Sequence, residues 1–207
     1  MLFVWYISCG DIKPPVESLT YTDTIPLVGG VDSVRMEIDT HITLSQARNR
    51  VIDWFESQTY VRELTGKNDG KEVESYLLFS NLKKGDPWCA AFLYTGFHTS
   101  VDSFHVLTHP GFSPSWFRFP VTLVYSRSWK KSDFVSQPGQ VIGLWIPAKN
   151  RIGHVEVVVY EDKNNYYTIG GNTNQAGSDE GDGVYKKIRP KTLIYSISDP
   201  LLNLKYE

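Results

Sequence analysis

The pattern of apolar and polar residues changes character along this chain of 207 residues. Residues 10–43 combine several Pro and Gly with little periodicity, which predicts a tether or peripheral arm. From Leu44 apolar residues such as Val51, Phe55 and Leu64 recur at near-helical spacing, and a helix is expected up to a stop at about Gly66. A polar turn at 67–70 and a second short helix over 73–82 follow.

The segment 85–92 (GDPWCAAF) predicts the start of a third helix. Asp86 is a suitable N-cap, and Pro87 fits the first helical position, where its missing N–H is harmless. This places Cys89 in the first turn of a helix that runs to about Phe97. The residues from 98 to 120 are rich in Ser, Pro, Gly and aromatics and indicate long loops or an insertion.

The second half of the chain has a strand pattern. Short β-rich runs separated by turn residues cover 141–146, 153–160, 166–170, 184–189 and 193–197. Helices followed by a meandering antiparallel sheet predict an α+β domain. We expect this domain to span 44–198, with a short C-terminal tail over 199–207.

Composition narrows the function classes. The length suits one ordinary domain, and a net charge of −2 argues against a general nucleic-acid binder, which needs a basic face. The only cysteines are Cys9 and Cys89, and neither has ligands at metal-binding spacing, so we expect no metal and no cofactor.

The N-terminus is a candidate export signal. Residues 1–8 form an apolar run that ends at Cys9, as in a bacterial lipoprotein signal of about residues 1–9, although a basic start is missing. Cys9 is therefore a candidate for lipidation and membrane anchoring, with a short buried strand as the alternative. The expected location is the cell envelope, as a periplasmic or outer-membrane lipoprotein, or outside the cell.

Cys89 is the candidate nucleophile. A thiol attacks a carbonyl as the thiolate, and the N-terminus of a helix stabilises that anion and lowers the pKa of the thiol. The alternative is an inert cysteine buried in a helix, which is a common fate for a lone cysteine.

His154 is the candidate base. In the run 153–160 it shares one face of the strand with Glu156, while alternate valines form the other face. If residues 161–165 form a hairpin loop, Tyr160 pairs with Tyr166 and His154 stands opposite Asn172, roughly 5 Å away between Cβ atoms. Asn172 could then orient the imidazole. A bulge at the neighbouring glycines would make Thr173 or Gly171 the partner instead.

The other histidines fit these roles less well. His98 lies about 180° around the expected helix from Cys89, and His41 precedes the domain. His105 and His109 lie in the loop-rich insertion without an evident third metal ligand.

An ordered series of motifs resembles the CHAP family, the cysteine- and histidine-dependent amidohydrolases/peptidases. The series covers about Ser45 to Arg189 and consists of 61–70 (VRELTGKNDG), 87–92 (PWCAAF), 126–129 (SRSW), 138–139 (PG), 153–155 (GHV) and 170–174 (GGNTN). The resemblance implies a papain-like fold related to NlpC-type enzymes and cleavage of amide bonds in bacterial peptidoglycan. It also implies Cys89 as nucleophile, His154 as base and the Gly-Gly-Asn motif as the source of the orienting residue.

The chain departs from the family pattern at three positions. Gly170 stands where many relatives have an acidic residue, Glu156 where relatives tend to have a small one, and Gln140 where an Asp is usual. Glu156 could replace the missing carboxylate or block the cleft. Of the two candidates for orienting His154, we favour Asn172, because a side chain two residues along the same strand points parallel to the imidazole.

These observations predict a peptidoglycan amidase or endopeptidase that acts through a thioester, as a monomer. The backbone N–H of Cys89 is an oxyanion-hole candidate. Asn68, Asp69 and Trp88 are candidates for substrate binding or secondary roles, with a plain exposed turn as the alternative for the first two. The alternatives for the whole protein are a non-catalytic envelope-binding module on the same fold and a secreted antibacterial toxin.

Overall fold

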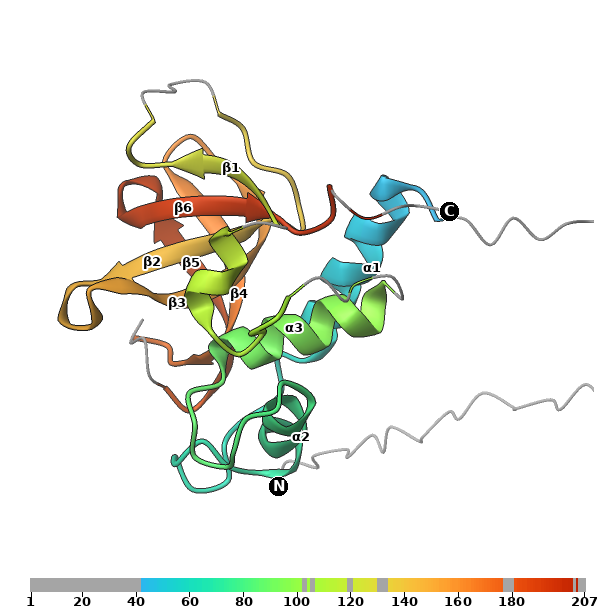
Figure 1. The fold of residues 1–207 in the computed structure, drawn as a ribbon, viewed down its shortest axis with the longest axis vertical. Coiled ribbons are helices and arrows are strands. Elements are labelled where there is room, and N and C mark those ends of the chain that lie inside the picture. The colour runs from blue at the N-terminus through green and yellow to red at the C-terminus, as the bar shows by residue number, and fades with distance from the viewer. Residues whose placement is uncertain are drawn as a thin grey trace, which may run out of the picture. The chain divides into compact units, whose positions relative to one another are not determined.

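The computed structural model describes residues 42–101, 104, 107–118, 121–129, 134–176, 181–202 and 204 (Figure 1). The expected signal, Cys9, the N-terminal arm as far as His41, and residues 203 and 205–207 of the C-terminal tail lie outside these residues. Within them, three α-helices and a six-stranded antiparallel sheet confirm the α+β class.

The three helices come first in the chain, as expected. Helix α1 (Leu44–Ser57) begins with a capping box between Thr43 and Gln46, which satisfies its first N–H groups. It ends well before Gly66, and the reason lies in the backbone of Val61. The carbonyl of Val61 accepts a hydrogen bond from Val184 in the sheet, so this segment pairs with a strand instead of continuing the helix.

Helix α2 (Lys71–Phe79) follows the polar turn, and helix α3 (Cys89–Ser100) is the third. The boundary of α3 corrects one expectation. Trp88 is the N-cap, and no side chain caps the helix. The Asp86 carboxylate instead accepts a bond from the backbone N–H of Lys83 at 2.8 Å, and Pro87 precedes the helix. Cys89 is still in the first turn.

The sheet has the strand order β1-β6-β2-β3-β4-β5, and every neighbouring pair is antiparallel. Its strands are β1 (Thr122–Ser126), β2 (Val141–Ile146), β3 (Arg151–Glu161), β4 (Asn165–Thr173), β5 (Gly183–Pro190) and β6 (Ile194–Asp199). Five of them lie at the expected places. Strand β1 was not predicted, and neither were the three 3₁₀ turns at Ser113–Phe117, Pro147–Lys149 and Lys191–Leu193.

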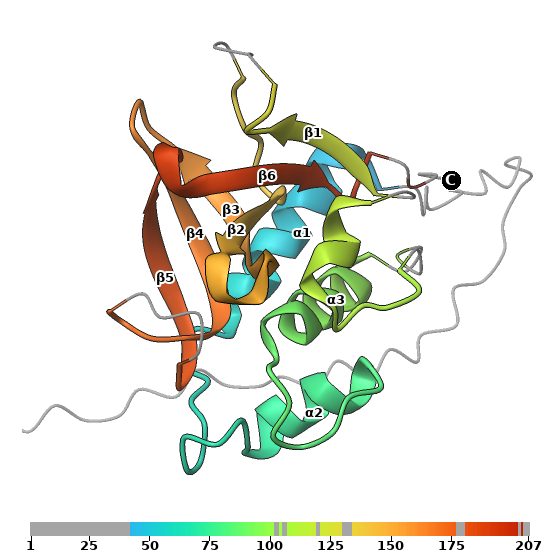
Figure 2. The ribbon, with the colours of Figure 1, turned by 60° about the vertical axis from the view of Figure 1, so that its left-hand side comes forward.

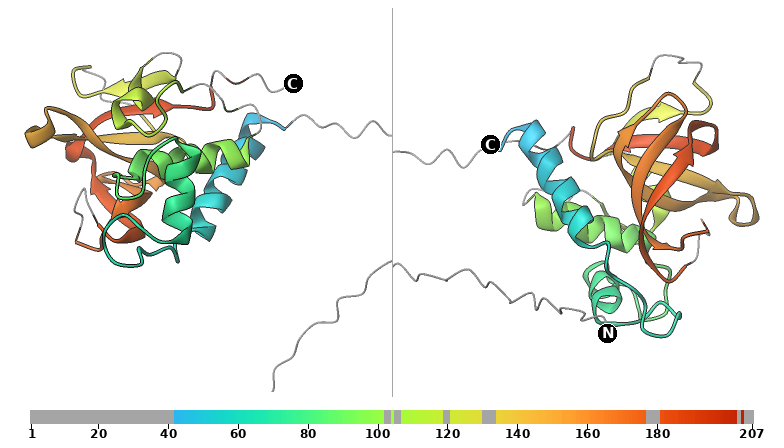
Figure 3. Two further views of the ribbon diagram at one scale, coloured as in Figure 1. Left: turned by 60° about the horizontal axis from the view of Figure 1, so that its bottom comes forward. Right: turned by 180° about the vertical axis from the view of Figure 1, so that it is seen from behind.

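Helix α3 is the centre of the packing. It contacts α1, α2 and strands β3 and β4, and the three helices lie together beside the curved sheet (Figures 2 and 3). A buried aromatic cluster fills the space between the layers and contains Phe55, Trp88, Phe92, Phe97, Phe104 and Trp116. A smaller core of Ile142, Val158, Tyr166, Ile194 and Ile197 is separate from it. The N-terminus of α3 is thereby fixed against the middle of the sheet.

Candidate active site

Cys89 is held at the first position of α3 and is 4% exposed. Its Sγ lies 3.6 Å from the Oγ of Ser113, the first residue of the 3₁₀ turn in the insertion. Ser113 is buried as well, and its hydroxyl lies 3.5 Å from the carbonyl oxygen of Gly153, the residue before His154. Ser113 therefore connects the nucleophile candidate to the strand that carries the base candidate.

His154 lies on β3 with no exposed surface, and its two ring nitrogens have different surroundings. Nε2 is 3.1 Å from Oε1 of Glu156. Because an ionised carboxylate only accepts hydrogen bonds, Nε2 is the donor of this pair. Nδ1 has no hydrogen-bond partner among the residues that the structure describes, and the neutral ring is thus a base at Nδ1. The thiol of Cys89 is the group with which the ring interacts.

The electrostatics of the pair favour a thiolate and an imidazolium. Burial alone would raise the pKa of the Cys89 thiol, but its interaction with His154, with help from Ser113, lowers it below its ordinary value. Burial alone would lower the pKa of His154, whereas its contacts with Cys89 and Glu156 raise it to about 9. Each group stabilises the charged form of the other, as nucleophilic catalysis by a Cys-His pair requires.

Glu156 anchors a buried polar network that spans three strands. Its carboxylate accepts bonds from the Thr168 hydroxyl on β4 at 2.6 Å and from Nε and Nη2 of Arg189 on β5 at 3.0 and 2.5 Å. Burial would raise the pKa of Glu156, but His154 and Arg189 hold it far below its usual range. Neither Thr168 nor Arg189 was predicted as a site residue. A signal for Arg189 was present in the sequence, because alternation along β5 places Arg189 on one face with Lys187.

Asn172 does not bind His154. In the amide orientation that satisfies both ends of the side chain, its oxygen accepts from the backbone N–H of Trp88 at 3.2 Å. Its nitrogen donates to Oδ1 of Asn68 at 3.0 Å and to the carbonyl oxygen of Gly181 at 3.1 Å. The side chain that we favoured for orienting the imidazole therefore holds the backbone just before Cys89, and Glu156 is the one in contact with the ring.

The register between β3 and β4 does not account for this difference. Tyr160 pairs with Tyr167 and not with the expected Tyr166, but a bulge between Val158 and Tyr160 restores the expected register toward the site, where Val158 faces Thr168. Regular pairing toward the site is recorded only as far as Val157 and Ile169. Asn172 then adopts a left-handed backbone with φ of 54°, which redirects its side chain.

The remaining predicted residues have supporting positions. Trp88 is fully buried and donates from Nε1 to Glu63 at 2.8 Å, so it belongs to the core and does not face a substrate. Asp69 is also buried, and it binds the backbone and hydroxyl of Thr65 within its own turn. Asn68 lines a polar pocket of about 360 Å³ together with Glu63, Gly66, Asn174, Gly181 and Asp182. Asn68 alone of the three lines an open space.

The other described histidines lie in different surroundings. His98 is on α3, with its ring 4.7 Å from that of Phe79, and His109 lines a separate pocket. His41 and His105 lie outside the described residues. Within the described ranges, no group of three or more His, Cys, Asp or Glu side chains could hold a metal ion.

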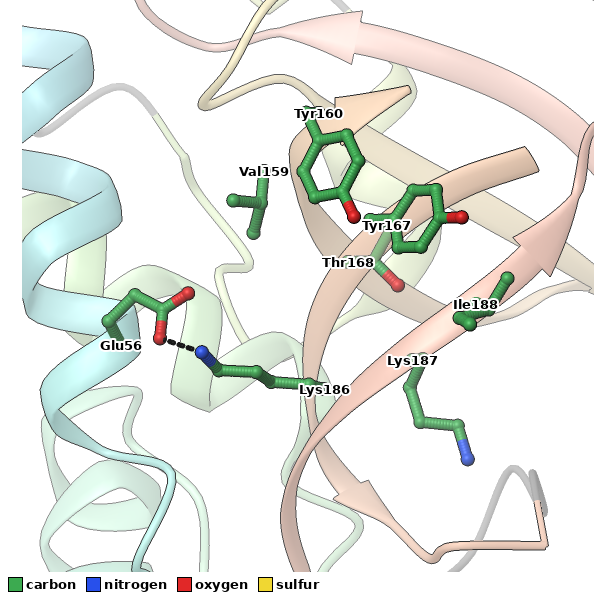
Figure 4. A pocket seen from close by; sticks show the side chains of 8 residues that line it. All are labelled: Glu56, Val159, Tyr160, Tyr167, Thr168, Lys186, Lys187 and Ile188. Carbon is green, nitrogen blue, oxygen red and sulfur yellow. Dashed lines mark ion pairs between the residues drawn. The ribbon is translucent and has the colours of Figure 1, made fainter. Parts of the chain in front are cut away.

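A further pocket of about 390 Å³ opens beside α1 (Figure 4). It is lined by Glu56, Val159, Tyr160, Tyr167, Thr168, Lys186, Lys187 and Ile188. Lys186 and Glu56 form an ion pair across it, and the rings of Tyr160 and Tyr167 are stacked at 4.1 Å. Cys89, His154 and Glu156 are all absent from its lining, but the pocket shares Thr168 with the polar network of Glu156.

Comparison with protein-family models, curated proteins and solved structures gives no match. No helix in the described part of the chain has the length and apolar character needed to cross a bilayer. The site is therefore interpreted from its own geometry.

Proposed function

We propose that the chain is a cysteine hydrolase of papain-like fold that cleaves amide bonds of bacterial peptidoglycan. The observation that carries the proposal is the pairing of Cys89, at the N-terminus of α3, with a histidine whose far nitrogen is bound to a buried carboxylate. The ordered motifs that resemble the CHAP family support the fold and the substrate class.

The residues suit a two-step mechanism. The Cys89 thiol gives its proton to Nδ1 of His154, and the thiolate attacks the amide carbon. The backbone N–H of Cys89, at the positive end of α3, is placed to stabilise the oxyanion. The C–N bond then breaks, and the imidazolium returns the proton to the leaving amine. Water, deprotonated by His154, attacks the thioester, which releases the carboxylic acid and restores the thiol.

The decisive experiment is digestion of purified peptidoglycan with mass analysis of the fragments. We expect new amine and carboxylate ends from the wild-type protein and none from Cys89→Ala, which should fold because Ala90 and Ala91 already occupy this turn. The fragment masses also distinguish an amidase from an endopeptidase. Equal release by both proteins would refute the mechanism.

One observation favours a second candidate, a non-catalytic envelope-binding module. Cys89 is only 4% exposed and His154 is fully buried, which is also the environment of an inert structural thiol. Rapid modification of Cys89 by iodoacetamide at neutral pH would support the hydrolase. A folded protein that binds peptidoglycan and resists alkylation would support the binding module. Export and anchoring through Cys9 are proposed for either function.

A further inference from the structure

The carboxylate of Glu156 is completely occupied inside the protein. It contacts three side chains from three strands, namely His154 on β3, Thr168 on β4 and Arg189 on β5. Lys187 on β5 also acts on it through its charge, although its ammonium group binds the carbonyl oxygens of residues 174 and 175. A buried carboxylate with so many partners has one fixed position and one fixed charge.

Gly170 on β4 supplies the space for this carboxylate. A Cβ atom at position 170 would lie 2.7 Å from Cγ and 2.9 Å from Oε1 of Glu156. No side chain fits there while Glu156 keeps its place. The two positions therefore share one volume, and a carboxylate can be brought to it from β3 or from β4, but not from both.

We propose that Glu156 is the positioning residue of the candidate active site and that it fills a carboxylate position shared by residues 156 and 170. Glu156 holds Nε2 of His154 and so turns Nδ1 toward the thiol of Cys89. Asn172, whose amide is bound to Trp88, Asn68 and Gly181, secures the start of α3. This inference rests on the proposed Cys-His chemistry, but the first test below does not require hydrolysis.

The first test measures how the alkylation of Cys89 by iodoacetamide depends on pH. In this reaction the thiolate displaces iodide from the reagent, so the rate follows the thiolate fraction. Mass spectrometry of the peptide containing Cys89 separates it from Cys9 in the full chain. Removing the charge in Glu156→Gln weakens the imidazolium, which raises the pKa of the thiol. We expect the midpoint of the curve to move up by about one pH unit.

Glu161→Gln is the matched control. Glu161 is on the same strand and accepts bonds from Lys191 and Ser136 without contacting the site. Its loss should leave the midpoint unchanged. Equal midpoints in the wild type and Glu156→Gln, or equal shifts in both variants, would overturn the proposal.

The second test exchanges the carboxylate between strands. We expect Glu156→Ala to lower turnover on peptidoglycan by about 10- to 100-fold, because the base loses its orientation. The double variant Glu156→Ala/Gly170→Glu should recover most of that loss and return the alkylation midpoint toward the wild-type value. Gly170→Glu alone should be the least stable of the three, since two carboxylates then compete for one volume.

The outcomes separate this inference from the proposed function. An alkylation shift in Glu156→Gln together with no hydrolysis by the wild type would support the positioning role and reject the hydrolase. Hydrolysis by the wild type with unchanged kinetics in Glu156→Gln would reject the positioning role alone. If Glu156→Ala fails to fold because Arg189 is left unpaired, the near-isosteric Glu156→Gln still decides the question.

Discussion

In the part of the chain that the structure describes, two buried arginine–carboxylate ion pairs differ in what they are connected to. Arg48 on α1 binds Asp199 on β6 at 2.6 Å, and Arg189 binds Glu156 within the sheet. Both pairs join residues that are distant in sequence. Neither kind of contact identifies a site by itself, because buried ion pairs are common structural devices.

The difference lies in how each network ends. Around Asp199 the partners are Arg48, Gln140 and the backbone N–H of Leu201, and the second guanidinium nitrogen of Arg48 donates to the carbonyl oxygen of Pro138. None of these partners is a thiol or an imidazole, and we call this the closed network. The network of Glu156 continues to His154, whose Nδ1 has no hydrogen-bond partner in the described chain and whose ring interacts with a thiol. An open end beside a nucleophile distinguishes a candidate active site from a structural clamp.

The largest expected effect comes from removing that open end. His154→Ala should lower peptidoglycan turnover by about 10²- to 10⁴-fold, since the proton transfers lose their base. Steady-state release of fragments measures the effect, and Gln140→Ala serves as a control at the closed network. A His154→Ala protein with wild-type turnover would remove the histidine from the mechanism.

Breaking either ion pair should lower the stability of the folded protein by a similar amount. Arg48→Ala and Arg189→Ala each leave a buried carboxylate without its arginine, and we expect the free energy of unfolding to fall by about 3–5 kcal/mol in both. Urea denaturation measures the loss. Turnover per folded molecule should stay near the wild-type value for Arg48→Ala and fall for Arg189→Ala, where the carboxylate loses its fixed position. An equal fall in turnover for Arg48→Ala and Arg189→Ala would contradict the distinction between the two networks.

The pH dependence of kcat/KM should change when the network of Glu156 is altered and stay the same when the network of Asp199 is altered. Activity requires the thiolate and the imidazolium together, so kcat/KM should rise through a thiol pKa below its ordinary value and fall as His154 loses its proton near pH 9. Glu156→Gln should narrow this plateau from both sides, because the imidazolium is weakened and the thiolate with it. Arg48→Ala should leave both limits in place, and a shifted limit there would contradict the distinction.

Sequence reasoning located the parts of the site that depend on local signals. Cys89 follows from helix-start chemistry, and His154 and Glu156 follow from strand alternation. The capping residue was wrong, because the side chain of Asp86 binds backward to Lys83 instead of forward into the helix. These two arrangements of Asp86 differ by a single backbone rotation, and the adjacent polar residues do not determine which of them forms.

The long-range parts could not be predicted from pattern alone. The strand register beside the site was the expected one, but the left-handed backbone of Asn172 redirects its side chain away from His154. Arg189 and Ser113 reach the site from a distant strand and from an insertion that gave no periodic signal. Gly170 was visible as a departure from the family pattern, but its meaning required the distance to Glu156.

The smallest expected effect concerns Asn172, and it tests the division of roles most finely. Asn172→Ala leaves the N–H of Trp88 without its acceptor and puts alanine, which tolerates the left-handed region less well than asparagine, at φ of 54°, so stability should fall by about 1–3 kcal/mol. Asn172→Gly removes the same amide but accepts that backbone, and the difference between the two variants isolates the backbone cost. Turnover should decrease modestly in both, with unchanged pH limits, because Glu156 still holds the imidazole. If the Asn172 variants moved the upper pH limit and Glu156→Gln did not, the orienting role would belong to Asn172.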